Sequence, residues 1–254
     1  MTGQLDRLVA TMATLRDPIS GCEWDRAQTF ETIVPHTIEE VYEVADAVAR
    51  GDLDDIRGEL GDLLFQVVFQ ARIAEEAGHF DFDDVARAIA DKLEARHPHI
   101  FGDPAAPGDS REERWEALKA AERREKGAKS TLDGVALALP ALMRAEKLQK
   151  RAARVGFDWP DTDGPAAKLV EEIAELASAE RTDDRFEEAG DLLFSAVNLV
   201  RAYGIAPEDA LRQANSKFER RFREMEKLAG GDFAERDLAE QEKLWQAVKA
   251  AERL

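Results

Sequence analysis

The stretch EAGDLLF at residues 188–194 sets two carboxylates directly against an apolar run, and ELGDLLF at residues 59–65 repeats this almost letter for letter. The glycines of the two copies, Gly61 and Gly190, lie 129 residues apart. In each copy the glutamate and the aspartate are three positions apart, so a helix carries both on one face. The apolar residues that follow turn that helix toward a core. The pattern predicts paired acids at the edge of a helical core, present twice.

The repetition extends over the whole chain. Four further pairs of segments keep their order, with offsets that differ by only a few residues: CEWD at 22–25 and FDWP at 157–160, EEVYE at 39–43 and EEIAE at 171–175, KLEAR at 92–96 and KFERR at 217–221, WEALKAAER at 115–123 and WQAVKAAER at 245–253. Self-similarity on this scale indicates a tandem duplication of a helical domain. A glycine-rich break at 125–134 predicts an N-terminal domain at 1–126, a linker at 127–138 and a C-terminal domain at 139–254.

The composition predicts an all-α fold. Strong helix formers dominate, charged residues make up 35% of the chain, and no segment alternates apolar and polar residues as a strand would. In the first half the pattern predicts helices at 39–50, opened by a Thr37–Glu40 capping box, at 52–77, at 82–97, and from Ser110 onward, with Glu113 completing a second capping box. The second half repeats them at 165–180, 183–203, 207–229 and 237–252, after an added helix at 139–155.

Charge and cysteine content exclude several classes of protein. The net charge of −18 disfavours nucleic acid and anionic membranes as partners, because the long-range field repels both. Cys22 is the only cysteine, so no intrachain disulfide can form. The N-terminal residues lack the apolar segment of a signal peptide, and no apolar stretch approaches membrane-spanning length. These features predict a cytoplasmic protein.

The acidic pairs predict a metal site. Glu172 and Glu175 share one helical face, and Glu188 and Asp191 share a face of the next helix. The first half offers the equivalent acids Glu40, Glu43, Glu59 and Asp62. An isolated acidic motif is usually a solvated helix face, but four carboxylates beside a core need a cation to stay ionised. Mg²⁺ takes carboxylate oxygens and completes its shell with water and phosphates.

Basic residues near these acids favour a phosphate-bearing ligand. Lys168 lies one turn before Glu171 and Glu172, and Lys217 and Arg221 are four positions apart on a later helix. Such side chains recognise phosphates, although pairing with neighbouring acids is the preferred explanation for any one of them alone. Beside an acidic metal site they favour a bound polyanion that carries its own Mg²⁺. Trp245 could stack on a base, although a tryptophan on a terminal amphipathic helix more often packs in a core or an interface.

These motifs together resemble a known family. An EExxE motif followed by ExxD on the next helix, with LRDPISGCEWDRAQTF (15–30), RGELGDLLFQVVFQAR (57–72), DKLEARHPHIFGD (91–103), LPALMRAEKLQKRA (139–152) and ANSKFERRFREME (214–226), resembles the MazG family of all-α nucleoside triphosphate pyrophosphohydrolases. The likeness covers essentially the whole chain. One departure is Glu23, where relatives usually have proline.

The resemblance implies Mg²⁺-dependent hydrolysis of nucleoside triphosphates between the α and β phosphates, with Mn²⁺ as a possible substitute, by a homodimer. It implies that Glu172, Glu175, Glu188 and Asp191 bind the metal and carry catalysis, and that the substrate is held by Lys168, Glu171, Asn215, Lys217, Arg221 and Trp245. Spacing does not identify which acid is the general base. The first half has His36 in place of Lys168 and Ala90 in place of Asn215, so we expect the second half to carry most of the activity.

Two other classes compete with this interpretation. A di-iron carboxylate protein needs an ExxH motif on each of two helices. Only Glu94 and His97 have that spacing, and Pro98 follows directly. A non-catalytic acidic scaffold that binds partner proteins is the second alternative, and it leaves the paired acids and the basic residues without a shared purpose.

Overall fold

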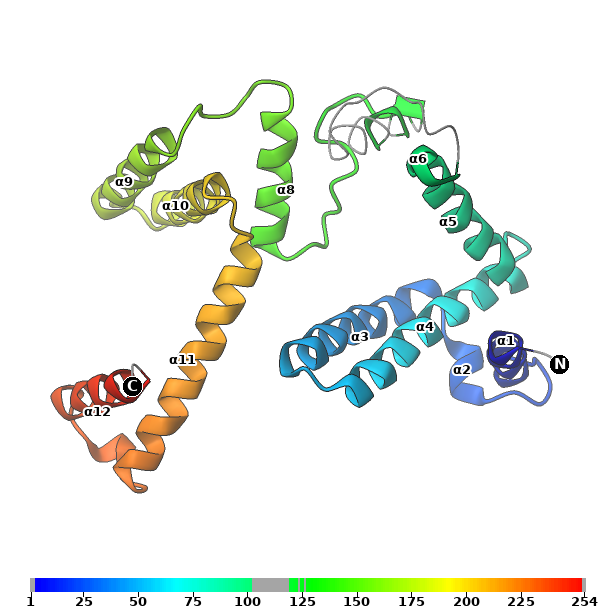
Figure 1. Ribbon diagram of the computed structural model, residues 1–254, viewed down its shortest axis with the longest axis horizontal. Helices are drawn as coiled ribbons and strands as arrows, with labels where there is room; N and C mark the ends of the chain where they lie inside the picture. The colour runs from blue at the N-terminus through cyan, green and yellow to red at the C-terminus, as the bar shows by residue number, and fades with distance from the viewer. Residues whose placement is uncertain (1–2, 102–118, 123, 126, 253–254) are drawn as a thin grey trace. The chain divides into compact units, whose positions relative to one another are not determined.

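The computed structural model describes residues 3–101, 119–122, 124–125 and 127–252, and within these residues it contains helices but no strand (Figure 1). The chain is therefore all-α, as predicted. Backbone contacts divide it into two compact units, Met1–Leu118 and Lys119–Leu254. The predicted domain limits and the linker at 127–138 stay predictions, because the stretch that leads up to them lies largely outside the described residues.

The first unit is built around an antiparallel pair of helices, α3 (Phe30–Arg50) and α4 (Leu53–Glu76), which pack along their lengths (Figure 1). Two residues join them. Gly51 ends α3 with a φ of 74°, and the Asp52 carboxylate starts α4 by accepting hydrogen bonds from backbone N–H groups of the next turn. α1 (Gln4–Leu15) packs on α4, and α2 (Glu23–Ala27), α5 (Phe82–Arg96) and α6 (Pro98–Phe101) complete the described part.

The second unit repeats the helical pair with α9 (Asp163–Ser178) and α10 (Thr182–Ala202). α8 (Ala141–Ala153) packs on α10. The long α11 (Pro207–Ala229) begins beside α8 and α10, and its later turns carry α12 (Leu238–Ala251), with a short 3-10 turn, η1 (Phe233–Glu235), between them (Figure 1). The second unit therefore contains two helical pairs, α9 with α10 and α11 with α12. The acids Glu172, Glu175, Glu188 and Asp191 lie on the first of these pairs.

The two copies share more than the sequence predicted. α1 packs on α4 as α8 packs on α10, so α8 has a counterpart in the first unit. The helix predicted at 139–155 is present as α8, but it is not an addition to the second half.

The predicted start of the first long helix is also wrong. α3 begins at Phe30, where the Thr29 hydroxyl accepts a hydrogen bond from the Thr32 N–H at 3.4 Å. Pro35 lies within its second turn, so the helix lacks the N–H that would donate to the Glu31 carbonyl there. Thr37 is inside the helix, and its hydroxyl donates to the Ile33 carbonyl at 3.2 Å. The helix predicted from Ser110 and Glu113 falls outside the described residues.

Both units leave large apolar side chains exposed on their central helical pairs. The first unit has a core of Met12, Ile33, Val68 and Phe69. On α3 and α4, however, Leu53 is 80% exposed and Val48 58%, and on α9 and α10 Phe186 is 84% exposed, Val170 67% and Leu193 60%. None of the described helices combines the length and apolar character that a membrane span requires.

Candidate metal and nucleotide site

The second acidic cluster forms where α9 and α10 lie side by side. Glu172, Glu188 and Asp191 each place one carboxylate oxygen within 4.8 Å of the others. Glu172 is 3% exposed, which is unusual for a carboxylate and requires compensation by a cation or a hydrogen-bond donor. Glu175 is not in this group of three, although its charge acts on Glu188. The structure therefore gathers three of the four predicted acids tightly.

Charge repulsion makes this cluster receptive to a cation. Desolvation raises the pKa of Glu188, and the neighbouring charges of Glu175, Glu172 and Asp191 raise it further. The Lys168 ammonium lies 2.8 Å from a carboxylate oxygen of Glu171 and 2.8 Å from one of Glu172. These two contacts raise the pKa of Lys168, so it stays protonated. The single positive charge of Lys168 therefore offsets only part of the negative charge of this cluster.

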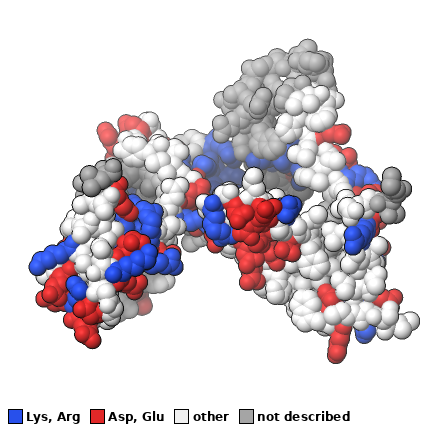
Figure 2. All heavy atoms as spheres, turned by 60° about the horizontal axis from the view of Figure 1, so that its bottom comes forward, with Lys and Arg blue, Asp and Glu red and all other residues white. Residues whose placement is uncertain are grey.

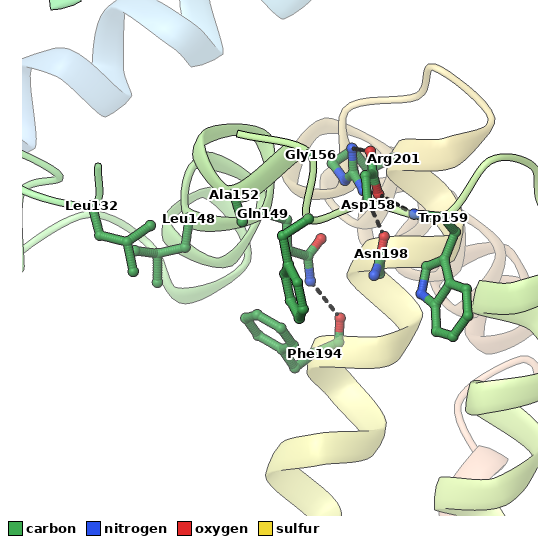
Figure 3. Close-up of a pocket in the computed structure, with 11 residues that line it drawn as sticks. Leu132, Leu148, Gln149, Ala152, Gly156, Asp158, Trp159, Phe194, Asn198 and Arg201 are labelled. Carbon is green, nitrogen blue, oxygen red and sulfur yellow. Dashed lines mark hydrogen bonds and ion pairs between the residues drawn. The ribbon is translucent and has the colours of Figure 1, made fainter. Parts of the chain in front are cut away.

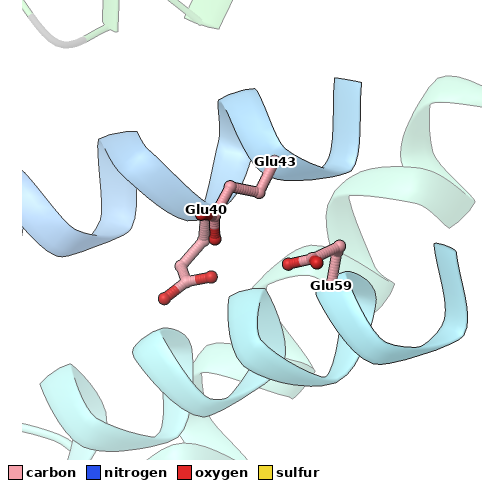
Figure 4. Close-up of side chains that lie close together, drawn as sticks. All are labelled: Glu40, Glu43 and Glu59. Atoms are coloured by element: carbon pink, nitrogen blue, oxygen red, sulfur yellow. The ribbon is translucent and has the colours of Figure 1, made fainter. Parts of the chain in front are cut away.

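The first cluster has similar geometry and different surroundings. Glu40 and Glu43 of α3 point toward Glu59 of α4, and one oxygen from each lies within 4.8 Å of the others (Figure 4). Asp62 is not in this group, yet its charge helps raise the pKa of Glu40 and of Glu59, after the larger effect of desolvation. The two groups of three therefore omit different acids. The first unit omits Asp62, the counterpart of Asp191, and the second unit omits Glu175.

The first cluster lacks the basic partner of the second. His36 stands where the second unit has Lys168, and its ring pairs with Glu39 at 3.7 Å, outside the group of three acids. The ring also meets Trp24 edge to face, with centroids 6.1 Å apart. An imidazole held in this way does not provide the ammonium group that Lys168 places beside Glu172.

Both clusters fit a hard divalent cation. Carboxylate oxygens this close together match the ligand type and spacing that Mg²⁺ and related ions use. The pKa values of Glu40, Glu59 and Glu188 are raised, first by desolvation and then by the charges of neighbouring acids. A cation would offset the repulsion between the acids. The donor set does not distinguish Mg²⁺ from Mn²⁺.

The other predicted substrate residues lie on α11 and α12. The Arg221 guanidinium is 5.4 Å from the Trp245 ring centroid and pairs with Glu252 at 2.6 Å. This pairing, with help from Arg220, lowers the pKa of Glu252 to about 2. Asn215 and Lys217 are exposed on α11. Within the described residues, no hydrogen bond or ion pair connects this group to the acids of α9 and α10.

The surface explains how an acidic chain accommodates an anionic ligand. Figure 2 shows Lys and Arg side chains interleaved with Asp and Glu on the visible face, so the net charge of −18 does not produce a uniformly negative surface. Ion pairs such as Arg223 with Glu219 and Lys227 with Glu224 account for part of this pattern on α11.

One set of residues beside the acids was missed by sequence reasoning. Gln149 donates to the Phe194 carbonyl at 2.9 Å, and Arg201 binds Asp158 through two N–H groups. The only sequence signal for this region was the Trp159 loop, which marked the repeat. Conversely, the di-iron alternative loses its one motif, because α5 ends at Arg96 and His97 lies beyond it with a ψ of 54°.

Comparison with known proteins identifies the family. The model of the MazG nucleotide pyrophosphohydrolase domain matches residues 28–101 and 165–225, one segment in each unit. The chain is 53% identical over 258 residues to a nucleoside triphosphate pyrophosphohydrolase of Escherichia coli strain K12, which covers 98% of both chains. It is 43% identical over 250 residues to the nucleoside triphosphate pyrophosphohydrolase/pyrophosphatase MazG of Thermotoga maritima, which covers 97% of this chain and 96% of the relative.

A more distant relative shares only part of its length. The nucleoside triphosphate pyrophosphohydrolase of Mycobacterium tuberculosis is 36% identical over 180 residues, which is 70% of this chain and 52% of that protein. The two longer matches extend over both acidic clusters, and the family model covers each of them. On these grounds the chain belongs to the MazG nucleotide pyrophosphohydrolase family.

Proposed function

We propose that the acidic cluster of α9 and α10 hydrolyses nucleoside triphosphates between the α and β phosphates, in a reaction that depends on Mg²⁺. Membership of the family makes the chain a hydrolase of phosphorus-containing acid anhydrides. The observation that carries the finer proposal is the group formed by Glu172, Glu188 and Asp191, with Lys168 directly beside it. This group offers oxygen ligands for a cation and a permanent positive charge for phosphates.

The chemistry follows from those charges. Glu172, Glu188 and Asp191 would hold Mg²⁺, and the charge of Glu175 acts on Glu188 from the same helix as Glu172. When bound, Mg²⁺ supplies positive charge that offsets the phosphates and makes nearby water more acidic. A carboxylate oxygen of the cluster accepts a proton from the water whose oxygen attacks the α phosphorus. The bond from that phosphorus to the bridging oxygen breaks, and pyrophosphate leaves.

Lys168 has a specific part in this scheme. Its ammonium lies between Glu171 and Glu172 at 2.8 Å from each, so it is already positioned at the edge of the cluster. A phosphate oxygen can share it, because an ammonium has three donors. Asn215, Lys217 and Arg221 on α11 would bind the remaining phosphates, and for Arg221 this means giving up Glu252.

The uncovered faces of α9 and α10 support a homodimer as part of this proposal. Phe186, Val170 and Leu193 are exposed on the helical pair that carries the acids. Side chains this apolar gain about 1.5–3 kcal/mol each when fully buried, and a second copy of the pair offers the same faces. Sedimentation of the full chain tests this, since a monomer at micromolar concentration would contradict it.

One experiment tests the reaction. The full chain is incubated with ATP, and separately with a panel of deoxynucleoside triphosphates, with Mg²⁺ or with a chelator, and products are followed by ³¹P NMR. We expect the monophosphate and pyrophosphate in equal amounts, only when the metal is present. Release of orthophosphate with the diphosphate would overturn the assigned bond. Equal turnover with Mg²⁺ and with the chelator would contradict the proposed dependence on a metal ion.

A further inference from the structure

The loop at 156–161, which precedes α9, contacts both of the helices that carry the acids of the second unit. Three residues, 179–181, join α9 to α10 at one end of this helical pair. The loop lies at the other end, where α9 begins and α10 finishes. The acids Glu172, Glu188 and Asp191 lie between these two ends, so both ends influence how closely the acids approach one another.

Asp158 attaches the loop to α10. Its two carboxylate oxygens accept hydrogen bonds from Arg201, at 3.0 Å from Nη1 and at 2.5 Å from Nη2 (Figure 3). These hydrogen bonds lower the pKa of Asp158, so it stays ionised. The Arg201 side chain is 11% exposed, and its Nη2 also donates to Oδ1 of Asn198 at 2.8 Å. A bidentate pair of this kind fixes the relative orientation of the two segments as well as their distance.

Trp159 attaches the same loop to α9. A Cβ at Gly164, the second residue of α9, would lie 2.4 Å from Cε3 of the Trp159 ring, which is closer than real Cβ contacts come. The helix can approach the ring this closely only because residue 164 is a glycine. The Trp159 N–H donates to Oδ1 of Asp158 at 3.0 Å, so the contacts to α9 and to α10 are linked.

Packing behind the loop is incomplete. A cavity of about 510 Å³ lies between α8, the loop and α10, and Phe157 and Asn198 are among the residues that border it (Figure 3). Phe157 is 81% exposed. Close packing normally fixes the position of a segment, and a cavity of this size removes part of that constraint. The position of the loop therefore depends on the contacts of Asp158 and Trp159.

The helical pair also buries few apolar side chains that could fix its register. The buried residues of α9 are Pro165 and Glu172, and those of α10 are Ser195 and Val197. Two of these four residues are polar. The position of α9 along α10 therefore depends on the two ends of the pair, which are the connection at 179–181 and the loop.

The first unit fixes its helical pair in a different way. Phe69 of α4 is 0% exposed and packs in the core with Ile33 of α3. It stands eight positions after the glycine of GDLLF, where the second copy has Asn198. Arg72, the counterpart of Arg201, pairs with two glutamates of its own helix. An apolar core thus takes the place that the loop contacts have in the second unit.

We propose that the Asp158–Arg201 pair and the contact of Trp159 with Gly164 form a loop anchor that positions the acids of α9 and α10 for the metal ion. This inference rests on the proposed function, since it takes these acids as the metal ligands. Mg²⁺ demands near-ideal octahedral geometry, and such sites need their groups held to within about 0.5 Å. Movement of α9 along α10 would separate Glu172 from the acids of α10. The four anchor residues are positioning residues.

Titration of Mn²⁺ into the full chain without nucleotide, with the free ion followed by EPR, tests the loop anchor. All variants carry Glu59→Gln, which removes a ligand from the first cluster. We expect Asp158→Ala to weaken Mn²⁺ binding about tenfold or more, the loss typical of groups that orient metal ligands. Arg201→Lys keeps the charge without the two parallel hydrogen bonds and should lose less. Arg16→Met breaks a pair of similar exposure in the first unit and should leave Mn²⁺ affinity unchanged.

Gly164→Ala separates positioning from a general loss of stability. Alanine is a better helix former than glycine, so this change does not weaken α9 itself, but its Cβ displaces the Trp159 ring. We expect it to weaken Mn²⁺ binding by a factor similar to that of Asp158→Ala, and to have no further effect in a Trp159→Ala background. Circular dichroism verifies folding, and Gly164→Ala keeps the test decisive if Asp158→Ala does not fold.

The outcomes separate the two proposals. Unchanged Mn²⁺ affinity in the anchor variants, or an equal loss in Arg16→Met, would refute the loop anchor. Loss of Mn²⁺ binding in Glu172→Gln would then still support the proposed function. If Glu172→Gln binds Mn²⁺ as tightly as its parent does, the metal cluster is misassigned, and the loop anchor fails with it because it has no ligands to position.

Discussion

The two acidic clusters have nearly the same carboxylates and very different neighbours. Glu172 is 3% exposed and touches Lys168, whereas its counterpart Glu40 is only half-buried and has the amide of Gln66 at 3.5 Å. Beyond the acids, the second unit has a cavity at Asn198 where the first has a packed Phe69. The comparison shows that acids able to bind a metal do not by themselves make a substrate site. The site also needs a basic side chain such as Lys168 and room for the substrate.

The largest difference is expected from removing one acid in each cluster. Glu188→Gln should lower the turnover of ATP by more than the roughly 10- to 100-fold typical of residues that only support a metal ligand. Glu59→Gln, the matched change in the first unit, should leave turnover near the wild-type value. Steady-state kinetics at saturating Mg²⁺ measures both. Equal losses in the two variants would break the comparison.

The basic partner should matter next. Lys168→Met removes a charge-assisted contact worth about 1.5–3 kcal/mol, so we expect the KM for ATP to rise about tenfold or more. His36→Met in the first unit should change neither KM nor kcat. A further variant, Glu171→Gln, frees Lys168 of one of its two acids and should leave its role in place. A normal KM in Lys168→Met would remove this residue from the proposed site.

A structural pair in each unit sharpens the contrast between packing and binding. Arg16, 6% exposed in its side chain, pairs with Glu76 and also donates to the carbonyls of Asp25 and Gln28. Because Glu76 remains partly exposed, Arg16→Met should lower the free energy of unfolding by about 2–3 kcal/mol, below the range for fully buried pairs. Urea denaturation measures this, and the KM for ATP should not change.

Arg201→Met is the counterpart in the second unit. It breaks the pair with Asp158 and the hydrogen bond to Asn198 on α10, the helix that also carries Glu188 and Asp191, so it should both destabilise the protein and raise the KM for ATP. If Arg16→Met raises the KM for ATP by as much as Arg201→Met does, then ATP binding is not confined to the second unit.

The smallest expected effect is a dependence of stability on pH. Glu40, Glu59 and Glu188 have pKa values raised above the ordinary 4.5, so the folded chain holds these protons more tightly than the unfolded chain does. Without metal, stability should therefore decrease as pH rises from about 4.5 through the raised values, and then level off. Mg²⁺ should reverse this, with a larger rise in Tm at pH 8 than at pH 5.

Thermal melts of Glu188→Gln and Glu59→Gln assign that effect to each cluster. We expect each variant to lose part of the pH dependence and part of the Mg²⁺ effect. A rise in Tm with Mg²⁺ that is the same in both variants and in the wild type would show that the ion binds elsewhere.

The acidic pairs and the duplication could be read from the sequence because both are local or repeated signals. Glu188 and Asp191 share a face by helical geometry alone. The expectation that the LLF run after them turns inward is wrong for most of the run, since Leu193 is 60% and Phe194 43% exposed. The contacts of the cavity gave no such signal, since Gln149 and Phe194 are 45 positions apart and Arg201 and Asp158 are 43. Extending the GDLLF register to Phe69 and Asn198 would have revealed the difference between the copies.

Some predictions failed because single residues were given too much weight. The Thr37–Glu40 spacing was taken as a capping box that opens a helix, but α3 begins earlier, at Phe30, and continues through Pro35. No helix was predicted over α1. The roles of Asn215, Lys217, Arg221 and Trp245 stay predictions, since contacts between helical pairs do not follow from spacing.

The central claim is that the second cluster, and not the first, carries the reaction. Product formation from ATP and Mg²⁺ by Glu172→Gln and by Glu40→Gln, followed by ³¹P NMR beside the wild type, tests it most directly. We predict that Glu40→Gln releases AMP and pyrophosphate at close to the wild-type rate and that Glu172→Gln releases almost none. Full activity of Glu172→Gln, with loss in Glu40→Gln, would contradict the account.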